Sequence, residues 1–354
     1  MKSIFITGGT GFIGSHTCLL LLEKDYTLFI LDSFVNSSKK SIERVSLILN
    51  QKGVDTLGKI YLIKGDIKNT SDLEKVFQMS IELKKPIDAV IHFAGLKSVS
   101  DSIKNPLIYW ENNISGTINL LKIMNKYKCN NIVFSSSATV YKTVSQERLY
   151  ENDICEPVNP YGQTKFTIEK ILKDVYDSDP SSWKIALLRY FNPVGAHQSA
   201  LIGEDPLENP NNIYPKITQV AIGKLEEIKI FGSDWPTPDG TAIRDYIHVV
   251  DLAEGHVLAL DYLFKEKAQI LTLNLGTGKG TSVLELIRIF EKVNNVQVPF
   301  RFDKRRLGDN SYVVADNSLA KLTLNWVPKK TLEDMCRDGW NWQLNNPNGY
   351  QEID

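Results

Sequence analysis

The sequence has little cysteine, and its few cysteines are scattered. Of 354 residues only four are cysteine: Cys18, Cys129, Cys155 and Cys336. They form no CxxC pair and have no histidine at metal-ligand spacing beside them, which excludes a zinc finger and a disulfide framework. We therefore expect no metal site, and a reducing, cytoplasmic setting.

Excess charge and long apolar runs are missing too. The 41 basic and 42 acidic residues give a formal net charge of -1, so no global basic field would gather nucleic acid or an anionic membrane. No apolar run approaches the roughly 18 residues of a membrane span. The run Ile4, Phe5 and Ile6 is far too short for the apolar part of a signal peptide. We expect a soluble protein without nucleic-acid or membrane partners, in which anionic ligands meet local charges.

Short apolar, β-prone runs alternate with longer amphipathic stretches through about residue 190. Strands that are apolar throughout and separated by helical patterns are expected in a parallel sheet covered by helices on both faces. The sequence thus predicts an α/β fold with a doubly wound parallel sheet, the Rossmann architecture. The predicted strands are Ser3–Ile6, Thr27–Leu31, Ile60–Ile63, Ala89–Phe93, Ile132–Ser135 and Ile185–Arg189.

The composition changes beyond Tyr190, where residues 195–215 are rich in Gly, Pro, Asn and acidic residues. We predict a Rossmann domain over residues 1–190 and a smaller mixed α/β substrate domain over residues 191–354. The two are expected to interleave, with residues 243–275 returning to the first, and a crevice between them is the expected ligand site. Further strands are predicted at Ile243–Val249 and Leu271–Leu275, and a helix begins at the capping box of Ser282 and Glu285.

A glycine-rich turn follows the first predicted strand. Residues 7–14, TGGTGFIG, lead from that strand into an amphipathic helix, the context in which such a motif binds a dinucleotide. Gly8 permits the tight turn, and Gly11 lets the backbone approach a pyrophosphate at the helix amino terminus. Gly14 lets the helix pack closely on its strand.

The second predicted strand ends in Asp32, eighteen residues after Gly14. A carboxylate there can accept hydrogen bonds from the adenosine ribose and would repel a 2′-phosphate. NAD is therefore the expected cofactor, and NADP is the alternative because Lys39 and Lys40 lie nearby.

Tyr161 and Lys165 stand four residues apart at the start of a predicted helix, so they share one face. A nearby ammonium lowers the pKa of a phenol, so such a tyrosine can exchange a proton with a hydroxyl. The alternative is a chance pair on a solvated face. Ser137 lies at the carboxyl end of a predicted strand, where ligands bind in doubly wound sheets. It is a candidate partner for the reacting oxygen, unless it merely satisfies its own turn.

The TGxxGxxG turn together with the Tyr161 and Lys165 pair resembles the extended short-chain dehydrogenase/reductase superfamily, whose Ser or Thr, Tyr and Lys act with NAD. Longer segments are more specific and are similar to the UDP-glucose 4-epimerase family, and this resemblance covers nearly the entire chain. The matching segments are His92–Lys97, Ser135–Tyr141, Leu188–Ala196 and Asp239–His248.

The resemblance implies a catalytic set of Ser137, Tyr161 and Lys165. It also implies that NAD contacts this set, the glycine turn and the turns after several strands. The implied cofactor-binding residues are Gly8, Gly11, Phe12, Ile13, Gly14, Asp32, Asn36, Ser37, Asp66, Ile67, Phe93, Ala94, Gly95, Lys97, Asn112, Ser137, Tyr161, Lys165 and Phe191.

The resemblance further implies a UDP-sugar site that lies mainly in the second domain. Arginine forks suit diphosphate oxygens, as an acidic substrate needs on a protein without a basic field. Without the resemblance, Arg305 and Arg306 would be taken as a solvated pair. The implied substrate contacts are Asn192 and Asn212 near the sugar diphosphate, Phe231 at the uracil, Arg244, Arg306 and Asp309 at phosphate and ribose, and in addition Lys97, Ser137, Tyr161 and Val313.

The implied activity is interconversion of UDP-galactose and UDP-glucose through a transient 4-keto sugar and enzyme-bound NADH, with Tyr161 as the base. A 4-epimerase of UDP-pentoses or UDP-N-acetylhexosamines is the nearest alternative, and a non-catalytic NAD-sensing protein is a remote one. A 4,6-dehydratase is disfavoured because Ala138 and Thr139 follow Ser137, where those relatives carry an acidic pair.

Two positions depart from the family pattern. Lys142 stands where glycine commonly follows Val-Tyr, and Val313 stands where many bacterial relatives have tyrosine beside the hexose. The smaller Val313 predicts room for an N-acetyl group, unless Tyr312 refills the space. The family also suggests a homodimer, with Asn105–Lys126 and Tyr161–Tyr176 as the candidate faces.

Overall fold

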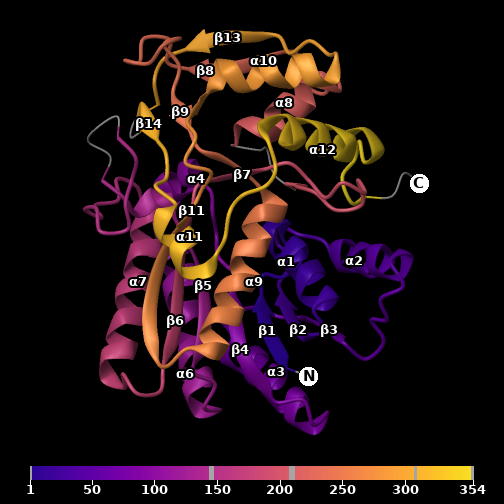
Figure 1. The fold of residues 1–354 in the computed structure, drawn as a ribbon, viewed down its shortest axis with the longest axis vertical. Coiled ribbons are helices and arrows are strands. Elements are labelled where there is room, and N and C mark those ends of the chain that lie inside the picture. Colours follow the sequence, from indigo (N-terminus) through magenta and orange to yellow (C-terminus); the bar gives the residue numbers. More distant parts are fainter. Residues whose placement is uncertain (1, 143–146, 207–211, 307–308, 352–354) are drawn as a thin grey trace.

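A seven-stranded parallel sheet forms the centre of the larger part of the molecule (Figure 1). The computed structural model describes residues 2–142, 147–206, 212–306 and 309–351. The strand order is β11-β6-β5-β4-β1-β2-β3, so the order reverses beside β1 and the ligand crevice is expected there. The strands are β1 (Ser3–Thr7), β2 (Thr27–Asp32), β3 (Ile60–Lys64), β4 (Ile87–His92), β5 (Asn131–Ser137), β6 (Lys184–Tyr190) and β11 (Gln269–Leu275).

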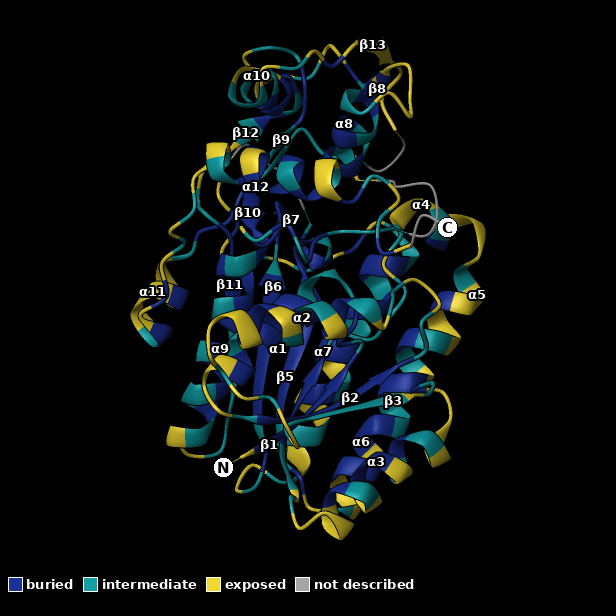
Figure 2. Cartoon of the chain, turned by 90° about the vertical axis from the view of Figure 1, so that its right-hand side faces the viewer, coloured by how far each residue is buried: buried dark blue, intermediate teal, exposed yellow. Residues whose placement is uncertain are grey.

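Helices cover both faces of this sheet, because its strands are apolar on both sides. Figure 2 shows the strands as the buried layer beneath partly exposed helices. One hydrophobic cluster packs α1 (Phe12–Glu23), α2 (Lys40–Gln51) and α9 (Val249–Lys265) on the sheet. A second cluster packs α3 (Thr70–Glu82), α6 (Gly116–Lys126) and α7 (Pro160–Ser178) on the opposite face. The predicted doubly wound Rossmann fold is confirmed.

Short helical segments follow β4 and β5 at the carboxyl end of the sheet. After β4 come α4 (Val99–Lys104), α5 (Pro106–Tyr109) and the π-helical turn η1 (Trp110–Ser115), which continues into α6. After β5 comes the single turn η2 (Ala138–Val140). These segments therefore stand at the edge where ligands bind in such sheets.

A smaller part of the molecule lies above this edge in Figure 1 and has its own core. Phe290 and Trp340 pack edge-to-face in that core, so Trp340 helps to hold the carboxyl-terminal helix. Its elements are β7 (Asn192–Val194), α8 (Ile213–Ala221), β8 (Ile228–Phe231), β9 (Ile243–Arg244), β10 (Tyr246–His248), β12 (Thr281–Ser282), α10 (Val283–Asn294), β13 (Phe300–Asp303), β14 (Tyr312–Val313) and α12 (Leu332–Asn345), while α11 (Ser318–Leu324) packs beside β11.

The single strand predicted over Ile243–Val249 is wrong. The chain instead forms β9, which pairs with β12 and β14, and then β10, which pairs with β7. Asp245 lies between them, and its buried carboxylate accepts hydrogen bonds from the backbone N–H groups of Thr277, Gly278 and Ala315. This carboxylate draws three loops together, so the chain changes partners there.

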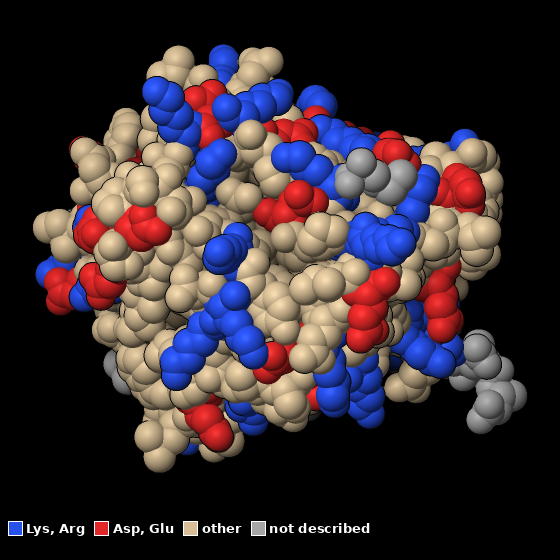
Figure 3. Space-filling view, turned by 90° about the horizontal axis from the view of Figure 1, so that it is seen from below, with Lys and Arg blue, Asp and Glu red and all other residues tan. Residues whose placement is uncertain are grey.

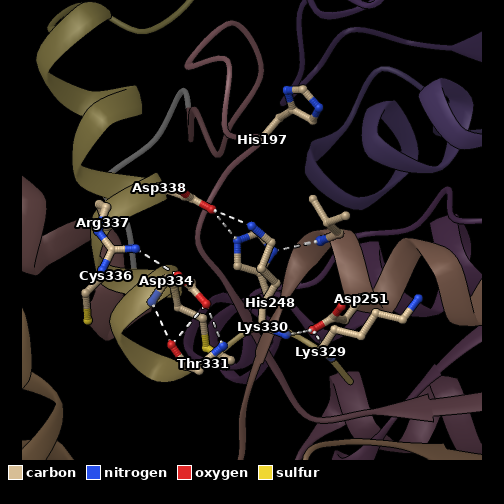
Figure 4. A network of polar contacts seen from close by, with 12 residues as sticks. His197, His248, Asp251, Lys329, Lys330, Thr331, Asp334, Cys336, Arg337 and Asp338 are labelled. Carbon is tan, nitrogen blue, oxygen red and sulfur yellow. Dashed lines mark hydrogen bonds and ion pairs between the residues drawn. The ribbon is translucent and has the colours of Figure 1, made fainter. Parts of the chain in front are cut away.

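A buried network fastens α12 to the start of α9 (Figure 4). His248 Nδ1 accepts a hydrogen bond from the Val250 N–H at 3.1 Å, so its proton is on Nε2, which lies 3.2 Å from Asp338 Oδ2. The Lys330 ammonium lies 3.3 Å from the same carboxylate. The carboxyl-terminal helix is therefore held against the junction of β10 and α9. Within the described part of the chain, no helix is both long and apolar enough to cross a bilayer.

Candidate active site

The glycine turn is packed so tightly that a side chain would not fit at Gly8 or Gly14. Gly8 has a φ of +71°, and a Cβ there would lie 2.7 Å from the backbone nitrogen of Ala94, in the turn after β4. A Cβ on Gly14 would lie 2.4 Å from the Gly8 carbonyl oxygen. Gly11 is the N-cap of α1, so the first backbone N–H groups of this helix are available for an anionic group.

Asp32 ends β2 beside this turn and is nearly buried. Its carboxylate accepts hydrogen bonds from the Thr10 N–H at 3.1 Å, the Phe34 N–H at 3.0 Å and the Ser37 hydroxyl at 2.8 Å. These contacts fix the carboxylate beside the turn, as recognition of a ribose requires. The side chains therefore fit a dinucleotide with unphosphorylated ribose.

The remaining predicted cofactor residues lie along the same edge of the sheet. Asp66 and Ile67 follow β3. Ile67 packs so closely on Gly116 that a Cβ on this glycine would lie 2.5 Å from Ile67 Cδ1. Phe93 follows β4 and packs against His256 with a centroid distance of 4.8 Å. Phe12 and Ile13 begin α1, Asn36 and Ser37 follow β2, Ala94, Gly95 and Lys97 follow β4, and Phe191 follows β6.

A loop from the smaller part closes this region from the other side. Thr10, Gly11 and Phe12 line a small cleft together with Gly203–Pro206 and Tyr350. Lys97 Nζ lies 3.3 Å from Glu204 Oε1 across it. Sequence reasoning missed Glu204, because nothing in the pattern of its loop indicates where the loop returns.

Asn112 and its neighbour Asn113 occupy different environments in η1. Asn112 is half-buried. Asn113 is buried, accepts a hydrogen bond from the Leu96 N–H at 2.8 Å, and donates to Thr164 Oγ1 at 3.0 Å. Asn113 thus joins the turn after β4 to α7, a role that the prediction for Asn112 did not include. The sequence does not show which of the two adjacent asparagines is buried, because the π-helical turn determines which way each side chain points.

Tyr161 and Ser137 face one another at the start of α7. Asn159 caps this helix through a hydrogen bond from the Gly162 N–H, and Tyr161 follows in its first turn, almost fully buried. Burial raises the pKa of the Tyr161 phenol, while a hydrogen bond with Ser137 acts to lower it. Ser137 Oγ also accepts hydrogen bonds from the N–H and hydroxyl of Thr139, so its own proton can be donated to Tyr161.

Lys165 lies one turn further along the same face of α7. Its Nζ donates to the Ser135 carbonyl at 2.8 Å and lies 5.9 Å from the centre of the Tyr161 ring. Burial lowers the pKa of Lys165 to about 8. Ser137 favours the phenolate by a direct hydrogen bond, and the Lys165 ammonium lies further along the same face of α7.

Charged side chains gather between β8, β9 and the loop before β14. Arg244 Nη2 lies 3.0 Å from Asp309 Oδ1, and Arg244 Nη1 donates to the Asn310 carbonyl at 2.8 Å. The Arg306 guanidinium stacks on Phe231, 3.7 Å from the ring centre. The structure thus brings together the four side chains predicted for the nucleotide.

Arg305 turns away from its neighbour Arg306. It stacks on Trp235 at 4.0 Å and pairs with Asp234 at 2.8 Å. Burial lowers the pKa of Arg306, although both arginines are exposed. Each of the two adjacent arginines stacks on its own aromatic partner.

Val313 connects the two parts of the site. It pairs with Arg244 in the β14–β9 ladder and packs against a cluster that contains Ala138 and Phe191. Asn192 lies in β7, and Asn212 is the N-cap of α8.

Lys142 turns outward and pairs with Glu156 at 2.6 Å. Among the residues that the structure describes, no group of three or more His, Cys, Asp or Glu side chains could hold a metal ion.

Known proteins are similar to this sequence along nearly its full length. A family model described as GDP-mannose 4,6 dehydratase matches residues 5–339. The chain is 48% identical over 349 residues to UDP-glucose 4-epimerase 2 of Arabidopsis thaliana, which covers 99% of this chain and 97% of the relative. It is 47% identical over 350 residues to the bifunctional UDP-glucose 4-epimerase and UDP-xylose 4-epimerase 1 of Pisum sativum, with 99% and 97% covered.

A solved structure is similar over the same extent. The crystal structure of UDP-glucose 4-epimerase from Bifidobacterium longum in complex with NAD+ and UDP superposes with a TM-score of 0.90 at 44% identity, and the match covers 98% of this chain and 100% of that chain. Sequence identity of this level over almost the whole chain, with the same fold, shows common descent. The chain therefore belongs to the UDP-glucose 4-epimerase family.

Proposed function

We propose that this protein is an NAD-dependent UDP-glucose 4-epimerase that interconverts UDP-galactose and UDP-glucose. The observation that carries the proposal is the face of α7, where Tyr161 meets Ser137 and Lys165 bonds the Ser135 carbonyl. This arrangement supports Tyr161 as a proton acceptor at the carboxyl edge of the sheet. When bound, NAD supplies the reversible transfer of hydride at C4 of the sugar.

The residues of this chain handle the proton. Tyr161 accepts the proton of the sugar 4-hydroxyl, and Ser137 orients the same oxygen by a hydrogen bond. Lys165, buried beside the phenol, bonds the strand end at the Ser135 carbonyl and would help to hold bound NAD. Once the hexose presents its other face, Tyr161 returns the proton, and the configuration at C4 is inverted.

The nucleotide half of the substrate anchors the complex. Arg244 and Arg306 offer planar forks to the diphosphate, and Asp309 holds Arg244 in place. Phe231 offers an aromatic ring to the uracil. Binding energy gathered on UDP holds the substrate while the sugar turns.

We infer that the hexose pocket also accepts N-acetylated or pentose sugars, because Val313 is small and borders Ala138 and Phe191. Tyr312, its neighbour in β14, is half-buried, and a turn of its ring into the pocket would cancel this space. Similarity to a bifunctional relative named for UDP-xylose supports the pentose alternative. Turnover of UDP-N-acetylgalactosamine and UDP-xylose relative to UDP-galactose decides between these substrates.

A dehydratase reaction, after which the matching family model is named, is not supported by the site. Elimination of water from C5 and C6 needs an additional acid and base beside the sugar. Ala138 and Thr139 stand at the positions next to Ser137, and neither side chain is an acid or base at neutral pH.

We infer a homodimer formed through α4, α5 and η1 together with α7. Leu107 is 80% exposed, and Ile103, Ile108 and Trp110 are also exposed large apolar side chains of this surface. The segments α5 and η1, which lie in the predicted face Asn105–Lys126, pack against α7, and so does the neighbouring α4, which lies outside that face. Contiguous apolar exposure of this kind marks an interface with another protein surface.

A cytoplasmic location is inferred from the cysteines. The four cysteines are unpaired, and burial raises the pKa of Cys18, Cys129 and Cys336, so these thiols resist oxidation. On the face drawn in Figure 3, basic and acidic side chains are interspersed. Such a face favours neither nucleic acid nor an anionic membrane as a partner.

The deciding experiment is incubation of the purified protein with UDP-galactose and no added reductant, with UDP-glucose followed by NMR. Formation of UDP-glucose without net accumulation of NADH supports the proposal. No conversion by protein that demonstrably contains NAD would reject UDP-galactose as the substrate and direct the search to N-acetylated hexoses and pentoses.

A further inference from the structure

One face of α7 carries three different charged or polar groups at a spacing of four residues. Tyr161 and Lys165 reach the site, and Glu169 follows one turn deeper, almost fully buried. Residues four apart lie above one another on a helix. The carboxylate of Glu169 is thus aligned with the two groups of the proposed reaction but lies behind them.

Glu169 is bound by two neighbouring strands. Arg189 of β6 donates from Nε to Oε1 at 2.9 Å and from Nη2 to Oε2 at 2.6 Å. The Ser136 hydroxyl of β5 donates to Oε1. A buried carboxylate held by a bidentate arginine and a hydroxyl has a fixed position, because separating it from the arginine would leave an unpaired charge out of water.

The contact with Ser136 controls the two residues on either side of it. The Ser135 carbonyl accepts the hydrogen bond from Lys165 Nζ, and the Ser137 hydroxyl meets Tyr161. Glu169 therefore fixes the position of the strand end Ser135–Ser137 relative to α7. A shift of this carboxylate would move both contacts of the site together.

Glu169 also supplies negative charge to Lys165. The titratable groups that face Lys165 are Tyr161 and Glu169 from α7 and His92 from β4, while the Phe134 ring and the Ser135 carbonyl face it from β5. Burial lowers the pKa of His92 to about 3, so this ring is neutral. Among these groups, Glu169 is the anion that opposes the loss of the Lys165 proton.

We propose that Glu169 is a positioning residue of the epimerase reaction, which holds Ser135–Ser137 against α7 through Ser136 and Arg189 and keeps Lys165 charged. This inference rests on the proposed function. Glu169 touches neither cofactor nor sugar and acts through Lys165 and the strand end. Nothing in the sequence pattern assigns it this role, because a Glu on a helix is most often a solvated residue.

The test is the pH profile of Glu169→Gln, measured on NAD-loaded protein with UDP-galactose between pH 6 and 9.5. Loss of the carboxylate lowers the pKa of Lys165 below its present value of about 8, so the lysine loses its proton at lower pH. We expect the alkaline limb of kcat to move down by roughly one pH unit. We also expect kcat at pH 7.5 to fall about tenfold with KM unchanged, because the UDP-binding residues lie elsewhere.

Two further variants separate positioning from plain stability. Glu169→Asp keeps the charge but withdraws it by one methylene, so its alkaline limb should lie between those of the wild type and Glu169→Gln. Ile168→Val changes a fully buried neighbour on the same helix and should leave both kcat and the pH profile as in the wild type. If Glu169→Gln does not fold, Glu169→Asp alone carries the test.

An alkaline limb of Glu169→Gln, or of Glu169→Asp when it stands alone, that superimposes on the wild type would overturn the inference. An equal acidward shift in Ile168→Val would overturn it too, since that shift would come from loosened packing. Wild-type protein serves as the reference for the function itself. If it converts UDP-galactose while the variants keep its profile, this inference alone fails; if it does not convert, the proposed function fails and takes the inference with it.

Discussion

At the scale of single residues, Tyr161 is the group on which the proposed chemistry depends. Replacing it with phenylalanine removes the proton acceptor and keeps the ring in its buried place. We expect turnover of UDP-galactose to fall about 10²- to 10⁴-fold. NAD should stay bound, because the glycine turn and Asp32 are unchanged. The measurement is conversion followed by NMR, with the NAD content determined by absorbance after the protein is denatured.

The matched control for this prediction is Tyr26→Phe. The Tyr26 hydroxyl bonds Asp261 between α1 and α9, away from the site, so its loss should leave turnover within about twofold of the wild type by its lack of contact with the reaction. Near-full activity of Tyr161→Phe would show that another group takes the proton.

Two adjacent arginines give a second test at the residue scale. Arg306 stacks on Phe231 in the nucleotide cluster, whereas Arg305 stacks on Trp235 and pairs with Asp234. We expect Arg306→Gln to raise KM for UDP-galactose roughly tenfold or more, since a charge-assisted hydrogen bond is worth about 1.5–3 kcal/mol. Arg305→Gln should leave KM nearly unchanged. Equal effects of both substitutions in steady-state kinetics would contradict the assignment of Arg306 to the diphosphate.

At the scale of elements, the apolar surface of α4, α5 and η1 predicts the oligomeric state. Leu107 is 80% exposed in α5, so an aspartate in its place meets only water in a monomer. In a dimer the same carboxylate is buried without a partner, at a cost of several kcal/mol. We therefore expect Leu107→Asp to shift the protein from dimer to monomer, as measured by light scattering at assay concentration.

Leu322 provides the control, because it is 83% exposed in α11 and lies outside the proposed interface. Leu322→Asp should remain a dimer with the mass of the wild type. A wild-type protein that is monomeric at assay concentration would reject the homodimer, and equal dissociation of both variants would place the interface elsewhere.

At the scale of the whole molecule, buried histidines set the response to acid. Burial lowers the pKa of His16 and His92 to about 3, and of His197 and His256 to about 4. In the unfolded chain these groups take up protons below about pH 6.5. Stability is therefore complete above that pH and is lost as the pH falls toward 4. We expect a loss of roughly 1 kcal/mol per histidine at pH 5.5, seen as a lower urea midpoint than at pH 7.5.

Buried carboxylates such as Asp245 have the opposite effect on stability at low pH, because burial raises the pKa of Asp245. One substitution separates the effect of the histidines from that of these carboxylates. His256 packs against Phe93 and Tyr190, so His256→Phe keeps an aromatic ring in place. The decrease in midpoint between pH 7.5 and 5.5, measured at constant NAD, should be smaller in this variant. An identical decrease in the two proteins would show that His256 does not contribute to the loss of stability at low pH.

Sequence alone determined those features that depend on neighbouring residues. The periodicity of apolar residues predicted the doubly wound sheet, and the TGGTGFIG turn with Asp32 predicted a dinucleotide site, because turn, strand and helix are local structures. The spacing of Tyr161 and Lys165 placed them on one helical face for the same reason. The longer motifs indicated the family, because they are continuous stretches of sequence.

Only the tertiary structure decided how distant segments meet. Glu204 reaches Lys97 across 107 residues, and Asp309 reaches Arg244 across 65. The bond from Glu169 to Ser136 and the change of strand partners at Asp245 are likewise set by packing. Such contacts leave no periodic signal, because they depend on where loops return to the sheet and which buried polar groups then find a partner.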